Sequence, residues 1–102
     1  MIAVIARLKV REGMAGEFEA AARDMVAAVA RAEAGRCLMY TLHRSVEEPN
    51  GYVFYEQYAD AAALESHGAT EHMRAFGGRL RGLLDGRPQI ERFDPVAALR
   101  EA

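Results

Sequence analysis

The stretch CLMYTLHRSVEEPNGYVFYEQY, residues 37–58, decides the fold. Residues 37–45 and 52–58 are two predicted strands, and the second is rich in the aromatic residues that favour sheets. Between them, residues 48–51 read Glu-Pro-Asn-Gly, a combination typical of tight turns. The stretch therefore predicts an antiparallel β-hairpin.

Upstream of the hairpin, residues 2–10 predict a strand and residues 14–33 a long helix. In the strand, Ile2, Val4, Ala6, Leu8 and Val10 alternate onto one face. The helix is predicted from one apolar stripe at helical spacing, formed by Met14, Phe18, Ala21, Ala22, Met25, Val29 and Ala32. Gly35 is placed to end this helix in a left-handed conformation.

Downstream of the hairpin, the sequence predicts a helix in two pieces and a last strand. Asp60 can cap a helix over 61–67, Gly68 interrupts it, and Thr70 can cap a second helix over 71–84. Residues 87–94 form the last predicted strand, and 95–102 a tail with room for one helical turn. The order β-α-β-β-α-β, with its second helix split, predicts an α+β, ferredoxin-like fold.

The predicted sheet is apolar on both faces. In the hairpin, Leu38, Tyr40 and Leu42 alternate with Met39 and Thr41, so each face receives apolar side chains. Helices cover one face of such a sheet, and the chain has no spare helix for the other. A second copy of the chain is the simplest cover, which predicts a homodimer.

Length and composition narrow the function further. The 102 residues predict one domain spanning 1–102, and a net charge of −2 argues against nucleic acid as the main partner. No apolar run reaches the ~18 residues of a membrane span, and the N-terminus does not read as a secretory signal. Cys37, the one cysteine, is expected to be a small core residue of a cytoplasmic protein.

Three segments resemble the antibiotic biosynthesis monooxygenase (ABM) superfamily: GRCLMY at 35–40, YVFYEQYADAAAL at 52–64 and HGATEHM at 67–73. The resemblance covers residues 2–94. It implies the dimeric α/β barrel of that superfamily, whose members include cofactor-free quinol and polyketide oxygenases, haem-degrading enzymes, isomerases and stress proteins. It also implies a pocket between the sheet and the split helix.

By this resemblance, His67 is the candidate catalytic residue, since a histidine can act as a base near neutral pH. The candidate substrate-binding residues are Tyr40, Phe54, Glu56, His72 and Phe76. Each has a structural alternative. His67 could simply end a helix, the aromatic rings could fill the core, and Glu56 could pair with Arg7 or Arg44 rather than orient a histidine or a substrate. His43 is expected at the surface or an interface.

The sequence predicts no metal and no tightly bound cofactor. On a continuous helix, residues five apart such as His67 and His72 diverge by about 140°, which disfavours a shared ion. By the resemblance, the haem-degrading branch has an asparagine, a tryptophan and a haem-ligating histidine at the positions of Ala6, His67 and Gly77. This chain has none of these three residues there and no tryptophan at all, so haem degradation is disfavoured. The sequence has no glycine-rich, phosphate-binding loop, so no motif indicates a bound flavin or nicotinamide.

Three functions remain open on the sequence. The first is a cofactor-independent monooxygenase that oxidises a quinol or another electron-rich aromatic with dioxygen. The second is a non-catalytic, dimeric module that binds a small molecule. The third is an isomerase of a small ketone.

Overall fold

The computed structural model describes residues 1–99 and gives the order expected from the sequence. The elements are β1 (Ile2–Lys9), α1 (Ala15–Ala32), β2 (Cys37–Arg44), β3 (Gly51–Tyr58), α2 (Ala61–Gly68), α3 (Glu71–Leu80) and β4 (Gln89–Phe93). This confirms the α+β, ferredoxin-like fold and its split second helix.

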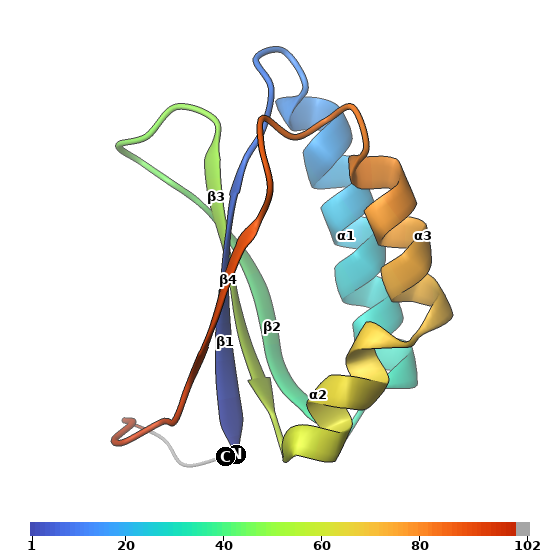
Figure 1. Ribbon diagram of the computed structural model, residues 1–102, viewed down its shortest axis with the longest axis vertical. Helices are drawn as coiled ribbons and strands as arrows, with labels where there is room; N and C mark the ends of the chain where they lie inside the picture. Colours follow the sequence, from blue (N-terminus) through green and yellow to red (C-terminus); the bar gives the residue numbers. More distant parts are fainter. Residues whose placement is uncertain (100–102) are drawn as a thin grey trace.

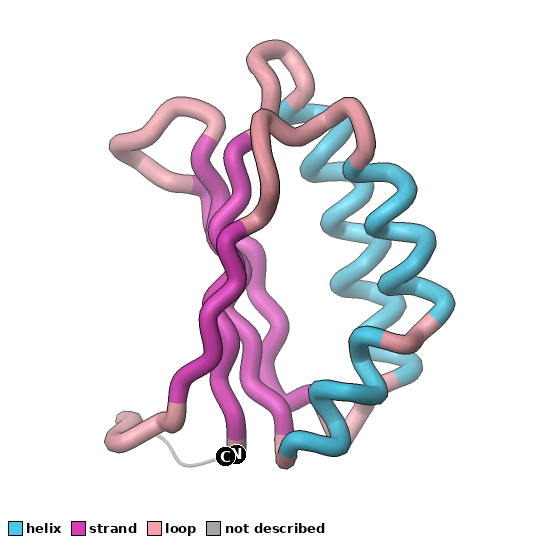
Figure 2. Tube along the Cα trace, in the orientation of Figure 1, coloured by secondary structure: helices cyan, strands magenta, loops and turns pink. Residues whose placement is uncertain are grey.

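The four strands form one sheet in the order β2-β3-β1-β4, and every neighbouring pair is antiparallel. All three helices lie on the same side of this sheet, as Figures 1 and 2 show. The molecule thus has two layers, a helical layer and a sheet whose far face carries no helix.

The core lies between the two layers. From β1, Val4, Ala6 and Leu8 point under the helices, as their alternation predicts. From α1, the buried stripe is Phe18, Ala21, Ala22, Met25 and Val29. The ring of Phe18, fully buried, lies 4.7 Å from that of Tyr52 on β3. In contrast to the expectation, Ala32 is exposed, because the helix ends there and the next residue turns inward.

The predicted caps are confirmed. The side chain of Asp60 accepts a hydrogen bond from the backbone N–H of Ala63 at 2.8 Å. Thr70 does the same for Met73 at 3.2 Å, and its hydroxyl also donates to the carbonyl oxygen of His67 at 2.8 Å. Gly35 has a φ of +81°, the left-handed conformation expected after α1. These local bonds fix where α2 ends and α3 begins.

The larger differences from the expected boundaries lie in the C-terminal part of the described chain, whereas those elsewhere are one residue each. Helix α3 ends at Leu80 rather than at residue 84, because Arg81 is extended and Gly82 takes a φ of +79°. Strand β4 covers only Gln89–Phe93. Residues 95–99 form no helical turn, and residues 100–102 of the expected tail lie outside the described part of the chain.

A β-bulge in β2 corrects the predicted alternation. Cys37 pairs with Tyr58 and Met39 pairs with Gln57, so Leu38 is an extra residue without a partner of its own. Leu38 is 40% exposed and does not share the inner face with Tyr40 and Leu42. The bulge allows both Cys37, which is half-buried, and Tyr40 to face the helices.

The far face of the sheet exposes apolar side chains. Tyr55 is 43% and Phe93 38% exposed, and Ile5 lies beside Tyr55 in the ladder. The ring centroid of His43, on the same face, lies 4.4 Å from that of Tyr55, so His43 belongs to this surface as expected. None of the helices within residues 1–99 is long and apolar enough to cross a membrane.

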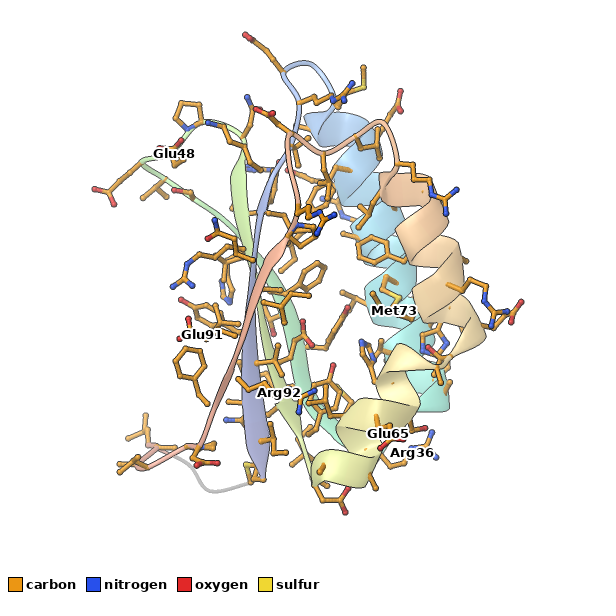
Figure 3. The ribbon with its side chains drawn as sticks, viewed as in Figure 1. Arg36, Glu48, Glu65, Met73, Glu91 and Arg92 are labelled. Carbon is orange, nitrogen blue, oxygen red and sulfur yellow. The ribbon has the colours of Figure 1, made fainter. Side chains whose placement is uncertain are left out.

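The helices also leave the edge strand β4 uncovered. Ile90 pairs with Ala6 and Arg92 with Val4, which places both on the helical side of the sheet. Nevertheless Ile90 is 67% exposed and Arg92 is also exposed. Figure 3 shows Glu91 projecting to the far side of the sheet and Arg92 lying on the helical side. The side chains of β4 on the helical side of the sheet are therefore open to solvent.

Candidate functional site

A buried carboxylate organises the site. Glu33 directly follows α1, four positions after the buried Val29, so the apolar stripe of the helix continues into a charged residue. Its backbone carbonyl accepts hydrogen bonds from Arg36 and Cys37, which holds the turn into β2. Glu33 is only 2% exposed. A carboxylate this deep requires hydrogen-bonding partners.

Two histidines supply those partners. Nδ1 of His67, at the end of α2, lies 3.0 and 3.1 Å from the two carboxylate oxygens of Glu33. Nε2 of His72, in the first turn of α3, lies 2.5 Å from Oε2. His67 is buried and His72 is half-buried. Three side chains from three helical segments thus meet at one carboxylate.

This meeting corrects the expectation that His67 and His72 diverge. The divergence holds for a continuous helix, but α2 ends at Gly68 and α3 begins at Glu71. Thr70 between them is extended, with φ −73° and ψ 155°, so the two helices have different axes. The possible ligand atoms of Glu33, His67 and His72 all lie within 4.8 Å of one another, a spacing compatible with a metal ion.

Two tyrosines flank the ring of His67. Its centroid lies 5.4 Å from that of Tyr40 on β2 and 5.2 Å from that of Tyr58 on β3. Burial raises the pKa of both phenols far above the usual value, and the charge of nearby Glu56 adds to the rise. Both phenols are therefore neutral near pH 7. Since Nδ1 of His67 faces Glu33, Nε2 is the nitrogen that remains for a ligand; it has no hydrogen-bond partner among residues 1–99.

Glu56 makes a different contact from those considered on the sequence. Its Oε1 accepts a hydrogen bond from the hydroxyl of Tyr58 at 2.6 Å. The expected ion pair is wrong, because Arg44 binds Glu19 at 2.6 Å and Arg7 lies on the opposite face of the sheet. Burial raises the pKa of Glu56 to about 7, although the bond from Tyr58 opposes the rise; the negative charge of Glu33 adds to it.

The remaining candidates, Tyr40, Phe54 and Phe76, pack against one another and form an aromatic layer next to the histidines. The rings of Tyr40 and Phe54 lie 5.0 Å apart, and those of Phe54 and Phe76 6.0 Å apart at right angles. Phe54 and Phe76 belong to the main hydrophobic core, and the partly buried Met73 packs against the same cluster. Figure 3 shows Met73 on the side of α3 that faces the sheet. All six sequence candidates therefore lie in one region, with Phe54 and Phe76 as its packed floor.

A groove of about 590 Å³ opens beside this region, between α1 and β2. Its lining residues are Glu19, Ala22, Arg23, Val26, Ala27, Ala30, Tyr40, Thr41, Leu42, Arg44 and Tyr52. At one end, the hydroxyl of Tyr52 donates to Glu19 at 2.6 Å, beside the Arg44 ion pair. These two contacts lower the pKa of Glu19. Tyr40 therefore borders both the groove and the ring of His67.

Sequence reasoning missed Glu33. The signal was present, since a charged residue four positions after Val29 continues the buried stripe of a helix. A helix-end glutamate is usually solvated, however, and only the fold brings it to His67, 34 positions along the chain. The role of orienting a histidine, considered on the sequence for Glu56, fits the contacts of Glu33.

The geometry can be compared with known proteins. Residues 1–79 match the family model described as antibiotic biosynthesis monooxygenase. YcnE of Bacillus subtilis (strain 168), a protein named as a proposed monooxygenase, is 33% identical over 94 residues, covering 92% of this chain and 97% of YcnE.

Two crystal structures are similar over nearly the whole chain. One is a proposed antibiotic biosynthesis monooxygenase from Caulobacter crescentus, 41% identical with a TM-score of 0.89, covering 94% of this chain and 90% of that one. The other is PA3566 from Pseudomonas aeruginosa, 34% identical with a TM-score of 0.83, covering 94% of each chain. With the family match over residues 1–79, these relatives show that the chain belongs to the antibiotic biosynthesis monooxygenase family.

Proposed function

We propose that the protein is a cofactor-independent monooxygenase that oxidises a quinol or another electron-rich aromatic with dioxygen. The observation that carries this proposal is the pair formed by Glu33 and His67. The buried carboxylate accepts the Nδ1 proton of the imidazole, at 3.0 and 3.1 Å, and leaves Nε2 to accept a proton. A histidine held in this way by a carboxylate is a recurrent arrangement for a general base.

The proposed chemistry needs little beyond this base. His67 takes the hydroxyl proton of the bound quinol, and the resulting phenolate is electron-rich enough to pass one electron to triplet dioxygen. One oxygen atom then enters the ring and the other leaves as water, the quinol itself supplying the electrons. The protein binds the aromatic, removes the proton and excludes water, and a buried histidine among Tyr40 and Tyr58 suits these tasks.

The groove between α1 and β2 has a lining that suits an aromatic substrate. Its lining is mostly apolar, and Tyr40 offers a ring face that a planar substrate can stack against. The Glu19–Tyr52–Arg44 cluster at its end offers polar partners for a second hydroxyl. We therefore propose that substrate enters along this groove and is deprotonated by His67, with Glu56 and His72 lining the inner side of the site.

The proposed active form is a homodimer. The far face of the sheet exposes the rings of Tyr55 and Phe93, and a second copy of the chain presents an identical apolar face. Packing of the two sheets would leave both helical layers, and therefore both candidate sites, on the outside of the dimer.

The experiment is oxygen consumption with a panel of reactive quinols. His67→Ala should lower the rate by about 10²–10⁴-fold, the usual contribution of a general base, with a smaller effect on KM. His43→Ala, which changes an exposed histidine outside the candidate site, is the matched control and should keep the wild-type rate, because alanine keeps the far face of the sheet apolar. If the wild type is no faster than buffer with every quinol, the proposed oxygenase activity is wrong and the binding module becomes the favoured function.

A further inference from the structure

The cluster of Glu33, His67 and His72 has the composition of a metal site. We propose that it binds one zinc-type divalent ion through a carboxylate oxygen of Glu33, Nδ1 of His67 and Nε2 of His72. These atoms lie within 4.8 Å of one another, although they come from the end of α1, from α2 and from α3. The ion is not needed for the proposed oxygenation, so this inference goes beyond it.

The distances fit an ion once the side chains adjust. Zinc binds imidazole nitrogen and carboxylate oxygen at about 2.0–2.2 Å, which places neighbouring ligand atoms of a tetrahedral site about 3.3–3.6 Å apart. Nδ1 of His67 lies 3.0 Å from Oε1 of Glu33, slightly closer than this spacing. Nε2 of His72 lies 2.5 Å from Oε2 and must withdraw by about 1 Å to share an ion with it. The side chain of His72 is 18% exposed and has room to do so.

The charges also favour a cation. Among residues 1–99, the only ion-pair partners of Glu33 are the two histidines; no lysine or arginine contacts it. A carboxylate oxygen and two imidazole nitrogens are the ligand types that a zinc-type cation binds. Two nitrogens and one oxygen suit zinc and its transition-metal neighbours, whereas magnesium and calcium prefer oxygen ligands alone. Three protein ligands leave a fourth position for water.

The cluster is bordered on one side by the space between α1 and α3, where His72 lies. A small cavity of about 90 Å³ there is lined by His72, with Ala21, Asp24, Met25, Ala75, Phe76 and Arg79. Asp24 and Arg79 form an ion pair of 2.7 Å beside it, and both side chains are largely exposed. The side chain of His72 therefore borders a cavity whose rim is exposed to solvent.

Metal binding has a consequence for His67 that rests on the proposed function. When Nδ1 coordinates an ion, the neutral ring carries its proton on Nε2, the atom that would otherwise accept the proton of the substrate. The metal-loaded protein therefore lacks its base. The ion acts as an inhibitor of the oxygenase, and its removal restores activity.

The test uses untagged protein freed of metal with a chelator. Zn²⁺ is titrated by calorimetry, and Co²⁺ by the visible absorption that it gains in a low-symmetry nitrogen and oxygen site. The variants are His72→Ala and Glu33→Gln, with His43→Ala as the control. Since Glu33→Gln changes a buried residue and can fail to fold, the half-buried His72→Ala carries the test, with circular dichroism as the check on folding.

We expect one ion per chain, kept in His43→Ala and weakened at least about 10-fold in His72→Ala. Absence of binding by the wild type, or equal binding by His72→Ala, overturns the site. A second measurement follows oxygen consumption with a quinol. Zn²⁺ should suppress it and chelator restore it; an unchanged rate in zinc-loaded protein overturns the inhibitory role. Failure of the metal-free protein to consume oxygen contradicts the proposed function while leaving the binding result intact.

Discussion

Glu33 and His67 are 34 positions apart in the sequence, and both oxygens of the carboxylate lie within 3.1 Å of Nδ1 of the imidazole. This contact holds two helices together, because it joins the end of α1 to the end of α2. It also decides which ring nitrogen of His67 carries a proton. The single pair therefore links the packing of the helices to the tautomer of the proposed base.

Glu33→Gln should lower kcat by about 10²-fold or more, because an amide can present either its N–H₂ group or its oxygen to Nδ1 and no longer fixes one tautomer. KM should change less, since Glu33 is buried away from the groove. Steady-state oxygen consumption separates the two parameters. Glu71→Gln, an exposed glutamate in α3, is the control and should leave both unchanged. A loss confined to KM would contradict the positioning role.

Glu56 should make the protein less stable as the pH rises. Its folded pKa of about 7 lies above the ordinary 4.5, so the folded state holds the proton more tightly than the unfolded state. The stabilisation is complete below pH 4.5 and is lost as the pH rises through about 7. Each unit of raised pKa is worth about 1.4 kcal/mol.

Urea unfolding at several pH values across this window measures the effect. Glu56→Gln should remove this part of the pH dependence, because an amide can still accept the hydrogen bond from Tyr58 but does not titrate. Equal pH dependence in the variant and the wild type would show that Glu56 ionises as it does in water.

Phe18→Ala should destabilise the fold by about 3–5 kcal/mol, because it removes a fully buried ring and leaves a cavity beside Tyr52. This loss is a large share of the stability of a small domain, which is about 5–15 kcal/mol. Urea unfolding measures it as a lower midpoint. Val46→Ala, in the exposed hairpin turn, is the control and should stay within about 0.5 kcal/mol of the wild type.

Tyr55→Lys should dissociate the proposed dimer, because it places a charge in the middle of the exposed apolar face. Light scattering at micromolar concentration should give twice 11.2 kDa for the wild type and 11.2 kDa for the variant. Val46→Lys adds the same charge to the hairpin turn, outside the sheet, and should remain dimeric. A wild-type mass of 11.2 kDa would contradict the dimer itself.

Local signals were sufficient for the fold. The Pro49–Gly51 turn and the caps at Asp60 and Thr70 each act within a few residues, so the sequence predicts them directly. The resemblance also named six candidate residues that the structure brings into one region, and their roles stay predictions. Local signals did not predict the extra residue at Leu38, because a bulge depends on how two strands pair rather than on one strand.

The contact at the centre of the site was not predicted either, because it too depends on how separate segments are arranged. The contact of Glu33 with His67 and His72 depends on the angle between three helical segments, which no spacing in the sequence encodes. The spacing rule for His67 and His72 was correct for a continuous helix, and it failed because Thr70 ends the continuity. A long-range contact of this kind becomes visible only when the layers are assembled.

The break between α2 and α3 gives Thr70 an influence on the site out of proportion to its own contacts. Its hydroxyl touches only the backbone, as donor to the carbonyl of His67 and acceptor from the N–H of Met73. If a substitution at this position let residues 61–80 run as one helix, His72 would swing about 140° away from the face of His67. A related sequence could therefore lose the function of the site while it still has the glutamate and both histidines. A comparison of those three positions alone would not reveal the loss.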